Sequence, residues 1–318
     1  MTVLVTGGCG LVGSFAVREA LAQGEKVVAF DLALKKELLE DIADQVIFFQ
    51  GNVLHPTDLA RAVAEHGVKR ILHSASFLTP GAYARPYAAA ETTVMGTLNV
   101  LETARTLRLD RVTYVSTGKT AWSGGAFAKS QGSGELAIDP DPYTSAKIGA
   151  ELLCNDYRKM YDLDVVILRL GGQVFGPGLA FTGAIGQGMQ PLIELPLRGE
   201  SVKVDTPVLP FSAPVMPMLY ARDAGRGCLL ATISSSLKHY VYDIAPVENC
   251  TLSETVAIIQ AVIPGADIQV PPSDLQGGPA QADPNAQADF GYEPHYDAER
   301  GIREYVHFLK TGKYAEVA

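Results

Sequence analysis

The sequence has 318 residues, of which 47% are hydrophobic and 19% are charged, a composition that suits a globular protein with a full hydrophobic core. Its formal net charge is −9, which argues against nucleic acid as a partner, because sequence-independent binding of nucleic acid needs clustered Lys and Arg. The four cysteines are far apart and form no C-x-x-C pair, so we expect neither a disulfide framework nor a bound metal.

Short apolar runs alternate with helical stretches through the first half of the chain. We predict strands at 3–5, 27–30, 46–49, 70–73, 112–115 and 165–168. A helix with an apolar stripe at Val12, Ala16 and Ala20 follows the first run, a long helix lies at roughly 86–107, and another begins near Tyr143. Near-continuous apolar strands between helices predict a parallel sheet covered on both faces, in an α/β fold.

Two irregular stretches, at 121–141 and 171–217, are rich in Gly, Ser and Pro. Loops of this length are usually functional or disordered, and we interpret these two as walls of a substrate pocket. No apolar run approaches the length of a membrane span, and no basic segment or cleavage site marks a secretory signal. We therefore expect a protein of the cytoplasm with no membrane partner.

A glycine-rich loop, Thr6-Gly-Gly-Cys-Gly-Leu-Val-Gly13, joins the first predicted strand to the first helix. In this context Gly7 permits the tight turn, Gly10 lets the backbone approach a pyrophosphate, and Gly13 lets helix and strand pack closely. The helix start at Leu11 and Val12 supplies N–H donors for the phosphates. We expect these five residues to bind a dinucleotide; the alternative is a tight turn alone.

Cys9 lies inside the glycine loop. It is either a reactive thiol or, as we prefer, a small residue that fills the turn.

Asp31 stands at the end of the second predicted strand. A carboxylate there accepts hydrogen bonds from ribose hydroxyls and repels a 2′-phosphate, which favours NAD over NADP as the cofactor. The alternatives are that Asp31 caps a helix, or that Lys35 and Lys36 receive a phosphate.

Tyr143 and Lys147 are four residues apart, so they share one face of the predicted helix. An ammonium and a positively charged nicotinamide near a tyrosine favour the phenolate and lower its pKa, which prepares it for proton transfer. Without the other motifs, this spacing would indicate only an exposed helical pair.

Ser116 and Thr117 end the fifth predicted strand. Ligands of open α/β sheets bind beyond the carboxyl ends of the strands, so a hydroxyl there can hold a substrate oxygen. The alternative is a strand-ending turn.

Together these residues resemble the extended short-chain dehydrogenase/reductase family, the NAD-dependent epimerase/dehydratase group, nearly end to end. The matching segments are Thr6–Gly13, Asp31, Asn52-Val53, His73-Ser-Ala-Ser76, Ser116-Thr117, Pro142–Lys147, Leu168-Arg169, Val174–Gly178 and Tyr220–Ala224. The resemblance implies a Rossmann-type doubly wound sheet with a smaller C-terminal substrate-binding region. It also implies a homodimer, in which the long helix and the Tyr143 helix pack against their mates.

The resemblance also implies individual roles. Tyr143 is expected to be the general acid/base, Lys147 to hold the nicotinamide ribose as well, and Thr117 to bind the reacting oxygen. The cofactor-binding set is expected to comprise Gly7, Gly10, Leu11, Val12, Gly13, Asp31, Asn52, Val53, Ala75, Ser116, Tyr143 and Lys147. In this set Asn52 and Val53 contact the adenine and Ala75 the cofactor backbone. The segment after Thr117 is one residue longer than usual, so either Thr117 or Ser116 faces the substrate.

Departures from the family pattern bear on the substrate. Asn52 replaces the usual Asp but still offers an amide to the adenine. Gly118-Lys119 stands where dehydratases carry Asp-Glu, which argues against sugar 4,6-dehydration. The segment 208–219 has no basic residue, although a diphosphate needs charge-assisted donors; only Arg198, Lys203 and Arg222 flank it. These features favour a smaller or less charged substrate than a nucleotide sugar.

We therefore predict an NAD-binding Rossmann domain at 1–170 and a mainly substrate-binding region at 171–318, interleaved with it. The predicted activity is an NAD-dependent dehydrogenase that oxidises a secondary alcohol in a small hydroxy acid, a sugar or a sugar acid. One alternative is an NAD-dependent sugar or nucleotide-sugar epimerase. Another, of a different class, is a non-catalytic NAD-binding sensor or scaffold.

Overall fold

The computed structural model describes residues 1–121, 141–178, 189–204, 215–271 and 274–314. The chain divides into two compact units. The first unit comprises Met1–Leu170, Gly225–Ile244 and Pro284–Tyr292, and the second comprises Gly171–Ala224, Ala245–Asp283 and Glu293–Ala318. The assignment of NAD binding to residues 1–170 and of mainly substrate binding to residues 171–318 stays a prediction.

A seven-stranded parallel sheet forms the centre of the first unit, in the order β10-β6-β5-β4-β1-β2-β3. Its strands are β1 (Thr2–Thr6), β2 (Lys26–Asp31), β3 (Ile47–Gln50), β4 (Arg70–His73), β5 (Arg111–Thr117), β6 (Val165–Leu170) and β10 (Val241–Ile244). The order reverses between β1 and β4, as in a doubly wound Rossmann-type sheet. The predicted fold class is confirmed, and so are the six predicted strands.

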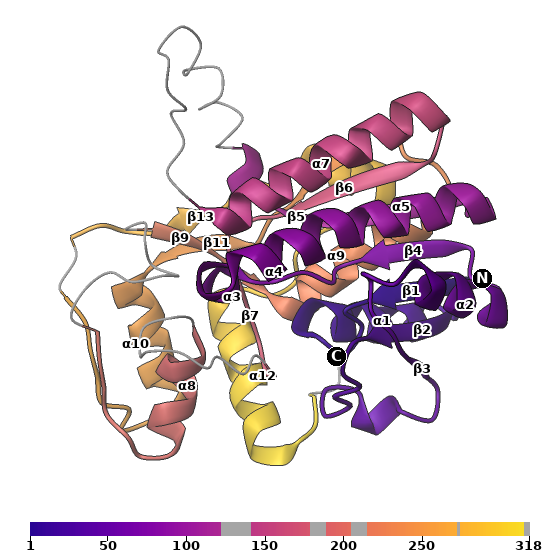
Figure 1. The fold of residues 1–318 in the computed structure, drawn as a ribbon. Helices are drawn as coiled ribbons and strands as arrows, with labels where there is room; N and C mark the ends of the chain where they lie inside the picture. Colours follow the sequence, from indigo (N-terminus) through magenta and orange to yellow (C-terminus); the bar gives the residue numbers. More distant parts are fainter. Residues whose placement is uncertain (122–140, 179–188, 205–214, 272–273, 315–318) are drawn as a thin grey trace, which may run out of the picture. The chain divides into compact units, whose positions relative to one another are not determined.

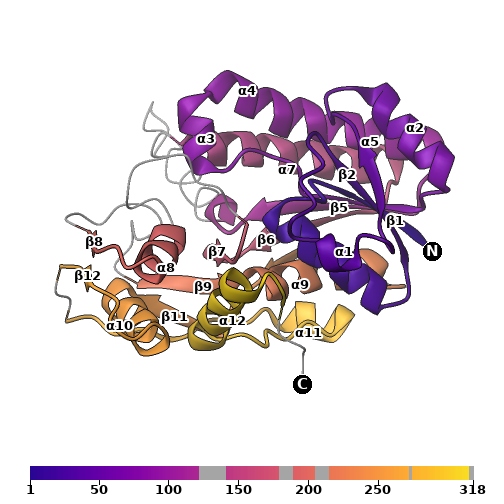
Figure 2. The ribbon, with the colours of Figure 1, turned by 90° about the horizontal axis from the view of Figure 1, so that it is seen from below.

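Helices cover both faces of this sheet (Figures 1 and 2). One layer contains α2 (Pro56–His66), α3 (Thr79–Ala84), α4 (Pro86–Ala90), α5 (Gly96–Leu107) and α7 (Pro142–Tyr161); the other contains α1 (Leu11–Ala22), α9 (Ala221–Ile233) and α11 (Pro284–Phe290). A short 3₁₀ turn, η1 (Glu40–Ile42), precedes β3. The single helix predicted at 86–107 is interrupted by a π-helical turn, η2 (Glu91–Met95). Because an i→i+5 turn keeps the chain helical, the apolar pattern did not reveal it.

The core of the first unit explains why its strands could be predicted from the sequence. Leu4, Val28, Ile71 and Val112 are fully buried and pack with the inner faces of α2, α5 and α7. On the other face Gly225 of α9 makes close contact with α1, since a Cβ there would lie 2.5 Å from the Phe15 Cβ. Strands buried on both faces must be almost wholly apolar.

The second unit has a four-stranded sheet in the order β13-β11-β9-β7 and a two-stranded sheet, β12-β8. The strands are β7 (Gln173–Phe175), β8 (Val202–Lys203), β9 (Val215–Tyr220), β11 (Glu248–Thr251), β12 (Ile268–Gln269) and β13 (Gly278–Pro279), and the helices are α8 (Met189–Leu197), α10 (Leu252–Val262) and α12 (Ala298–Thr311). The stretch 171–217 is therefore not one long loop. Most of the other stretch, residues 122–140, lies outside the described residues.

None of the helices in the described part of the chain is long and apolar enough to cross a membrane.

Candidate active site

The glycine loop wraps closely around its own backbone between β1 and α1. Gly7 has a φ of +67°, and a Cβ on Gly13 would lie 2.0 Å from the Gly7 carbonyl oxygen. Neither position tolerates a side chain, so the loop keeps an open backbone surface. Gly10 forms the N-terminal boundary of α1 without a side-chain cap from the described residues. The first N–H groups of α1, including those of Leu11 and Val12, therefore suit a pyrophosphate.

Asp31 lies against the same loop. Its Oδ2 accepts a hydrogen bond of 3.0 Å from the Cys9 N–H, and its Oδ1 accepts one of 3.3 Å from the Ala33 N–H. No α-helix begins among residues 32–46, all of which the structure describes, so Asp31 is not a helix cap. Lys36, the rival phosphate ligand, places its Nζ 4.4 Å from the centroid of the Phe48 ring.

Cys9 is only 8% exposed. Burial, followed by the negative charge of Asp31, raises the pKa of the Cys9 thiol to about 12. A thiol in this state is unreactive at neutral pH, which favours the packing role over the reactive one.

The remaining predicted cofactor residues follow β3 and β4 at the same edge of the sheet. The Asn52 side chain accepts a hydrogen bond of 2.9 Å from the Leu54 N–H, and the Val53 carbonyl accepts one of 2.9 Å from Asn99. Ala75 N–H donates to the Thr6 hydroxyl at 3.3 Å. The structure thus brings the glycine loop, Asp31, Asn52, Val53 and Ala75 to the carboxyl ends of β1 to β4, where a dinucleotide binds in such sheets. The glycine loop, whose backbone a cofactor can approach closely, and the carboxylate of Asp31 both lie at this edge, and together they suit NAD.

Thr117, Tyr143 and Lys147 gather at the end of β5. Tyr143 is the second residue of α7, and the Thr117 side chain lies near enough to its hydroxyl to oppose the effect of burial on its pKa. Lys147, one turn later, is 3% exposed and donates a hydrogen bond of 2.7 Å to the Val115 carbonyl. Its Nζ lies 5.9 Å from the centroid of the Tyr143 ring. The arrangement places a hydroxyl pair and a buried cation within one small volume.

The pKa of Tyr143 differs from the expectation, which was that it would be lowered. Burial raises the pKa of Tyr143 to about 12, which the nearby Thr117 side chain partly opposes and the charge of Asp141 reinforces. Burial also lowers the pKa of Lys147 to about 8, against the charge of Glu151. The net effect keeps the pKa of Tyr143 above its ordinary value, so burial outweighs the groups that favour the phenolate.

Ser116 turns away from the Thr117–Tyr143 pair. Its hydroxyl donates to Glu151 Oε1 at 2.6 Å, and the Thr120 hydroxyl donates to the same oxygen at 2.7 Å. Arg169 of β6 pairs with Glu151 through bonds of 3.1 and 2.7 Å. A contact of Ser116 with cofactor would therefore come from its backbone, and between the two hydroxyls Thr117 is the one that meets Tyr143. The sequence reasoning missed Glu151, although its position four residues after Lys147 was a visible signal.

Lys119 is a second cation beside Tyr143. Its Nζ lies 3.3 Å from Asp141 Oδ2 and 5.9 Å from the centroid of the Tyr143 ring. Asp141 caps α7 by accepting hydrogen bonds from the backbone N–H groups of Tyr143 and Thr144. Burial favours the neutral form of Asp141, but the Thr144 hydroxyl and the charge of Lys119 outweigh it and lower the pKa of this carboxyl.

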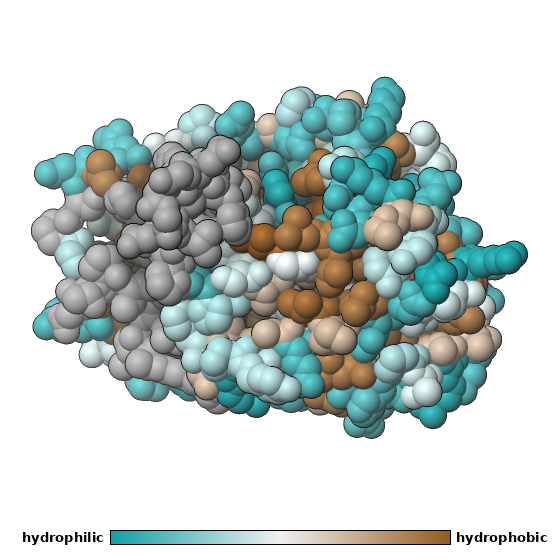
Figure 3. Space-filling view, turned by 45° about the horizontal axis from the view of Figure 1, so that its top comes forward, coloured by the Kyte–Doolittle hydropathy of each residue, from teal (hydrophilic) through white to brown (hydrophobic). Residues whose placement is uncertain are grey.

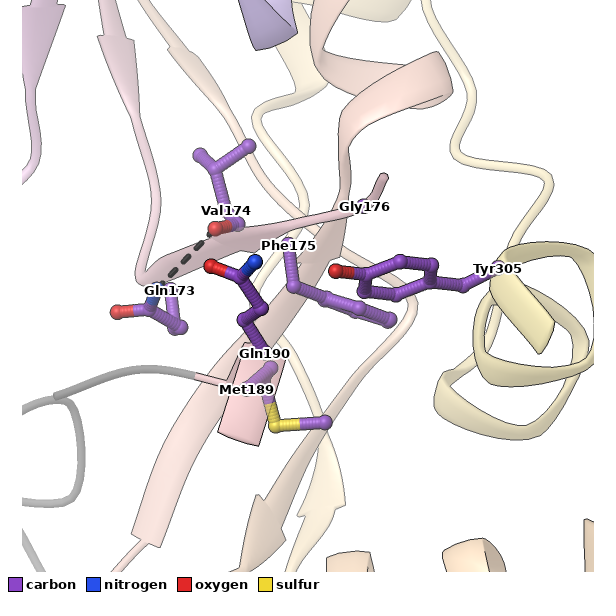
Figure 4. A pocket seen from close by; sticks show the side chains of 7 residues that line it. All are labelled: Gln173, Val174, Phe175, Gly176, Met189, Gln190 and Tyr305. Carbon is purple, nitrogen blue, oxygen red and sulfur yellow. Dashed lines mark hydrogen bonds between the residues drawn. The ribbon is translucent and has the colours of Figure 1, made fainter. Parts of the chain in front are cut away.

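A small pocket lies in the second unit, around β7 and the start of α8 (Figure 4). It is lined by Gln173, Val174, Phe175, Gly176, Met189, Gln190 and Tyr305. The Gln173 amide donates to the Val174 carbonyl at 3.1 Å, and Tyr305 donates to Glu194 at 3.1 Å. The space has room for about one water molecule, too little for a substrate.

Comparison with known proteins gives consistent relatives. Residues 3–245 match the NAD dependent epimerase/dehydratase family. Over 185 residues the chain is 29% identical to a UDP-glucose 4-epimerase of Mycolicibacterium smegmatis, with 56% of this chain and 57% of that protein covered. It is 26% identical over 204 residues to a D-erythronate dehydrogenase of Haemophilus influenzae, with 63% of each chain covered. The matches span 57%, 44%, 49% and 63% of the first four curated relatives.

Among solved structures, a UDP-glucose 4-epimerase of Thermus thermophilus in complex with NAD superposes with a TM-score of 0.75 at 25% identity. The superposition covers 98% of this chain and 99% of that one.

Proposed function

The chain belongs to the NAD-dependent epimerase/dehydratase family, and from that premise we propose that it is an NAD-dependent dehydrogenase of a small secondary alcohol. The substrate class is that of hydroxy acids, sugars and sugar acids. The observation that carries the proposal is the Thr117–Tyr143–Lys147 group at the carboxyl end of β5, next to an edge that suits a dinucleotide. A non-catalytic sensor or scaffold would not need these three residues, so their presence together argues against that alternative.

The residues divide the chemistry among them. Bound NAD supplies the hydride acceptor for the carbinol carbon. Thr117 orients the substrate hydroxyl by a hydrogen bond, and Tyr143 takes its proton as general base. Lys147, held by the Val115 carbonyl, stabilises the phenolate through its positive charge and also binds the cofactor ribose. Asp31 accepts hydrogen bonds from the other ribose, so NAD is preferred to NADP.

The basic residues near the predicted substrate region favour a small substrate. Arg198 pairs with Glu194 at 3.1 Å. Arg222 pairs with Glu304 at 3.0 Å and donates to the Tyr296 hydroxyl at 2.9 Å. The Arg222–Glu304 pair is mostly buried, so a diphosphate would have to replace that partner, whereas the exposed pair of Arg198 exchanges more easily. The residues 208–214 of the segment without basic side chains lie outside the described residues.

Epimerisation is the second candidate. The similarity to UDP-glucose 4-epimerases favours it, and the same three residues serve a hydride transfer that is later reversed on the other face of the substrate. The test is to add sugars, sugar acids, hydroxy acids and UDP-sugars to the protein with NAD and to measure NADH and products. A dehydrogenase forms NADH in proportion to substrate consumed. Inverted substrate without net NADH would establish the epimerase instead.

We also propose that the protein is a homodimer, and a location in the cytoplasm stays a prediction. Leu152 of α7 is 60% exposed and Met95 of η2 is 46% exposed. Figure 3 looks onto this helical layer and shows hydrophobic residues gathered on it. Leu153, the neighbour of Leu152, packs into the core instead. Apolar side chains gathered on a helical surface are typical of an interface.

A further inference from the structure

The Lys147 ammonium lies over the ring of Tyr114 of β5. Its Nζ is 4.9 Å from the centroid of that ring, closer than the 5.9 Å that separate it from the Tyr143 ring. Tyr114 is 1% exposed and Lys147 is 3% exposed, so the ring stands where water would otherwise solvate the charge. An ammonium within about 6 Å of a ring centroid is attracted by the negative face of the ring, most strongly when both groups are desolvated.

The Tyr114 hydroxyl contributes nothing comparable. It is buried and has no hydrogen-bond partner of normal geometry in the described part of the chain. Burial raises the pKa of this phenol well above its ordinary value, and the nearby Thr97 hydroxyl only opposes that shift. Thr97 itself donates to the Thr93 carbonyl at 2.5 Å and shares a hydrogen bond of 3.1 Å with His73. Because a buried hydroxyl without a partner costs free energy, the useful part of Tyr114 is its ring.

The ammonium of Lys147 has three N–H donors, and the proposed function needs them for several partners. One donor is bonded to the Val115 carbonyl at 2.7 Å. In the proposed function the other two serve the Tyr143 oxygen and the cofactor ribose. A ring face stabilises a positive charge without accepting one of these hydrogen bonds, whereas a carboxylate in direct contact would take at least one of them.

Glu151 supports the same ammonium in a different way. Its carboxylate already accepts hydrogen bonds from Ser116, Thr120 and Arg169. Burial lowers the pKa of Lys147, and the charge of Glu151 opposes that shift. The other titratable groups that face Lys147 are neutral at pH 7, and they are Tyr143 and Cys154 of α7, Tyr114 of β5, His73 of β4 and Cys228 of α9.

We propose that Tyr114 is a positioning residue of the active site, whose ring face holds the Lys147 ammonium in place and stabilises its charge while two of its donors stay available. The need for those donors rests on the proposed function. The claim about Tyr114 itself concerns one ammonium and one ring, so it can be tested without turnover.

The experiment changes the electron density of the ring and keeps its shape. Tyr114→Phe removes the hydroxyl, and three further variants carry at this position a phenylalanine with one, two or three ring fluorines, which draw electron density away from the ring face. NMR of isotope-labelled lysine in the full chain follows the titration of Lys147, whose signal is the one lost in Lys147→Ala. Tyr114→Phe is expected to keep the pKa of Lys147 at about 8. Three fluorines are expected to lower this pKa by about 1, and one or two fluorines by less.

The same fluorinated rings at Phe30 serve as the control. Phe30 of β2 is buried and stacks on Phe49 with the ring centroids 5.6 Å apart, and two strands of the sheet lie between β2 and β5. These variants are expected to leave the pKa of Lys147 unchanged, which separates an effect of the Tyr114 ring face from a general effect of fluorine in the core.

The outcomes separate this claim from the proposed activity. A pKa of Lys147 that ignores the fluorines at position 114, or that falls fully in Tyr114→Phe already, overturns the role of the ring, whether or not NADH forms. A stepwise fall with the number of fluorines supports that role. If such a fall is found but none of the sugars, sugar acids, hydroxy acids or UDP-sugars yields NADH, the role of Tyr114 stands and the dehydrogenase is refuted.

Discussion

At the scale of single residues, the Tyr143 hydroxyl is the atom on which the chemistry depends. Tyr143→Phe keeps the half-buried ring and removes only the hydroxyl, so packing changes little. Loss of a general base is expected to lower kcat roughly 10²- to 10⁴-fold, with NAD affinity nearly unchanged. The rise of the wild-type oxidation rate with pH, as the phenol loses its proton, disappears in the variant. A variant that keeps more than about a tenth of kcat together with the pH dependence would assign proton transfer to another group.

Lys147→Ala provides the contrast to this substitution. It removes both the charge beside Tyr143 and the expected ribose contact, so kcat and NAD affinity are expected to fall together. Thr117→Val removes a hydroxyl but no charge, and it is expected to raise KM and lower kcat while NAD affinity stays the same. Steady-state kinetics and cofactor titration distinguish these patterns.

Glu151 is predicted to keep Lys147 charged. Burial lowers the pKa of Lys147 to about 8, and the Glu151 carboxylate opposes that shift. The groups that face Lys147 are Tyr143, Glu151 and Cys154 of α7, Tyr114 of β5, His73 of β4 and Cys228 of α9. Among these Glu151 is the only one that is an anion at neutral pH. Glu151→Gln removes this charge, so Lys147 loses its proton at a lower pH and the alkaline fall in activity moves to lower pH.

The pH profile of Glu151→Gln is compared with those of Glu151→Asp and Glu102→Gln. Glu151→Asp keeps the charge and is expected to restore the wild-type profile. Glu102 lies on α5 and bonds Arg105 and Tyr157 at the surface, so Glu102→Gln leaves the profile unchanged. A rate that falls equally at every pH in Glu151→Gln would mean that Glu151 acts only by holding Ser116, Thr120 and Arg169 in place.

At the scale of elements, the strands of the first unit were predictable because each is an apolar run buried on both faces. The second unit was less predictable. Its strand β9 pairs with β7 and β11, and β11 pairs with β13, so these short strands are defined by partners distant in sequence. The candidate site shows the same contrast. The glycine loop and the Tyr143–Lys147 spacing are local, whereas the Glu151–Arg169 and Lys119–Asp141 pairs join separate elements and leave no periodic pattern.

His73 joins three elements of the first unit. Its Nδ1 shares a hydrogen bond of 2.7 Å with Thr6 of β1, and its Nε2 shares one of 3.1 Å with Thr97 of α5. Burial and the charge of Lys147 lower the pKa of His73 to about 3, whereas an unfolded chain binds this proton near pH 6.5. Between these values the unfolded state holds more protons, so stability is greatest above pH 6.5 and falls as the pH drops.

The predicted slope is up to about 1.4 kcal/mol per pH unit in this window. Denaturant unfolding at pH 6.5 and pH 5 measures it, above the range in which most carboxylates titrate. His73→Asn lacks the titrating ring and is expected to lose up to about 2 kcal/mol less than the wild type between these two conditions. His55→Asn, at an exposed position, serves as the control. Equal losses in wild type and His73→Asn would show that His73 takes up its proton in the folded state.

At the scale of the whole molecule, the proposed dimer would bury the exposed apolar residues of the α5–α7 layer. The helices of this layer pack closely, since a Cβ on Gly149 of α7 would lie 3.7 Å from the Val94 side chain of η2. Met95 follows Val94, and Leu152 lies one turn beyond Gly149. The two exposed side chains therefore belong to one region of the surface. In a twofold interface each of them is buried twice.

Leu152→Glu tests this dimer most directly. Burial of one leucine side chain contributes about 1.5–3 kcal/mol, and the twofold axis doubles this, so a buried glutamate is expected to weaken association at least about 100-fold. Light scattering at micromolar concentration should show a dimer for the wild type and a monomer for Leu152→Glu, and Met95→Glu should act in the same direction. Leu309→Glu replaces another exposed leucine, on α12, and should leave the dimer intact. A monomeric wild type would exclude the dimer, and a dimer that survives both substitutions would place the interface on a different surface.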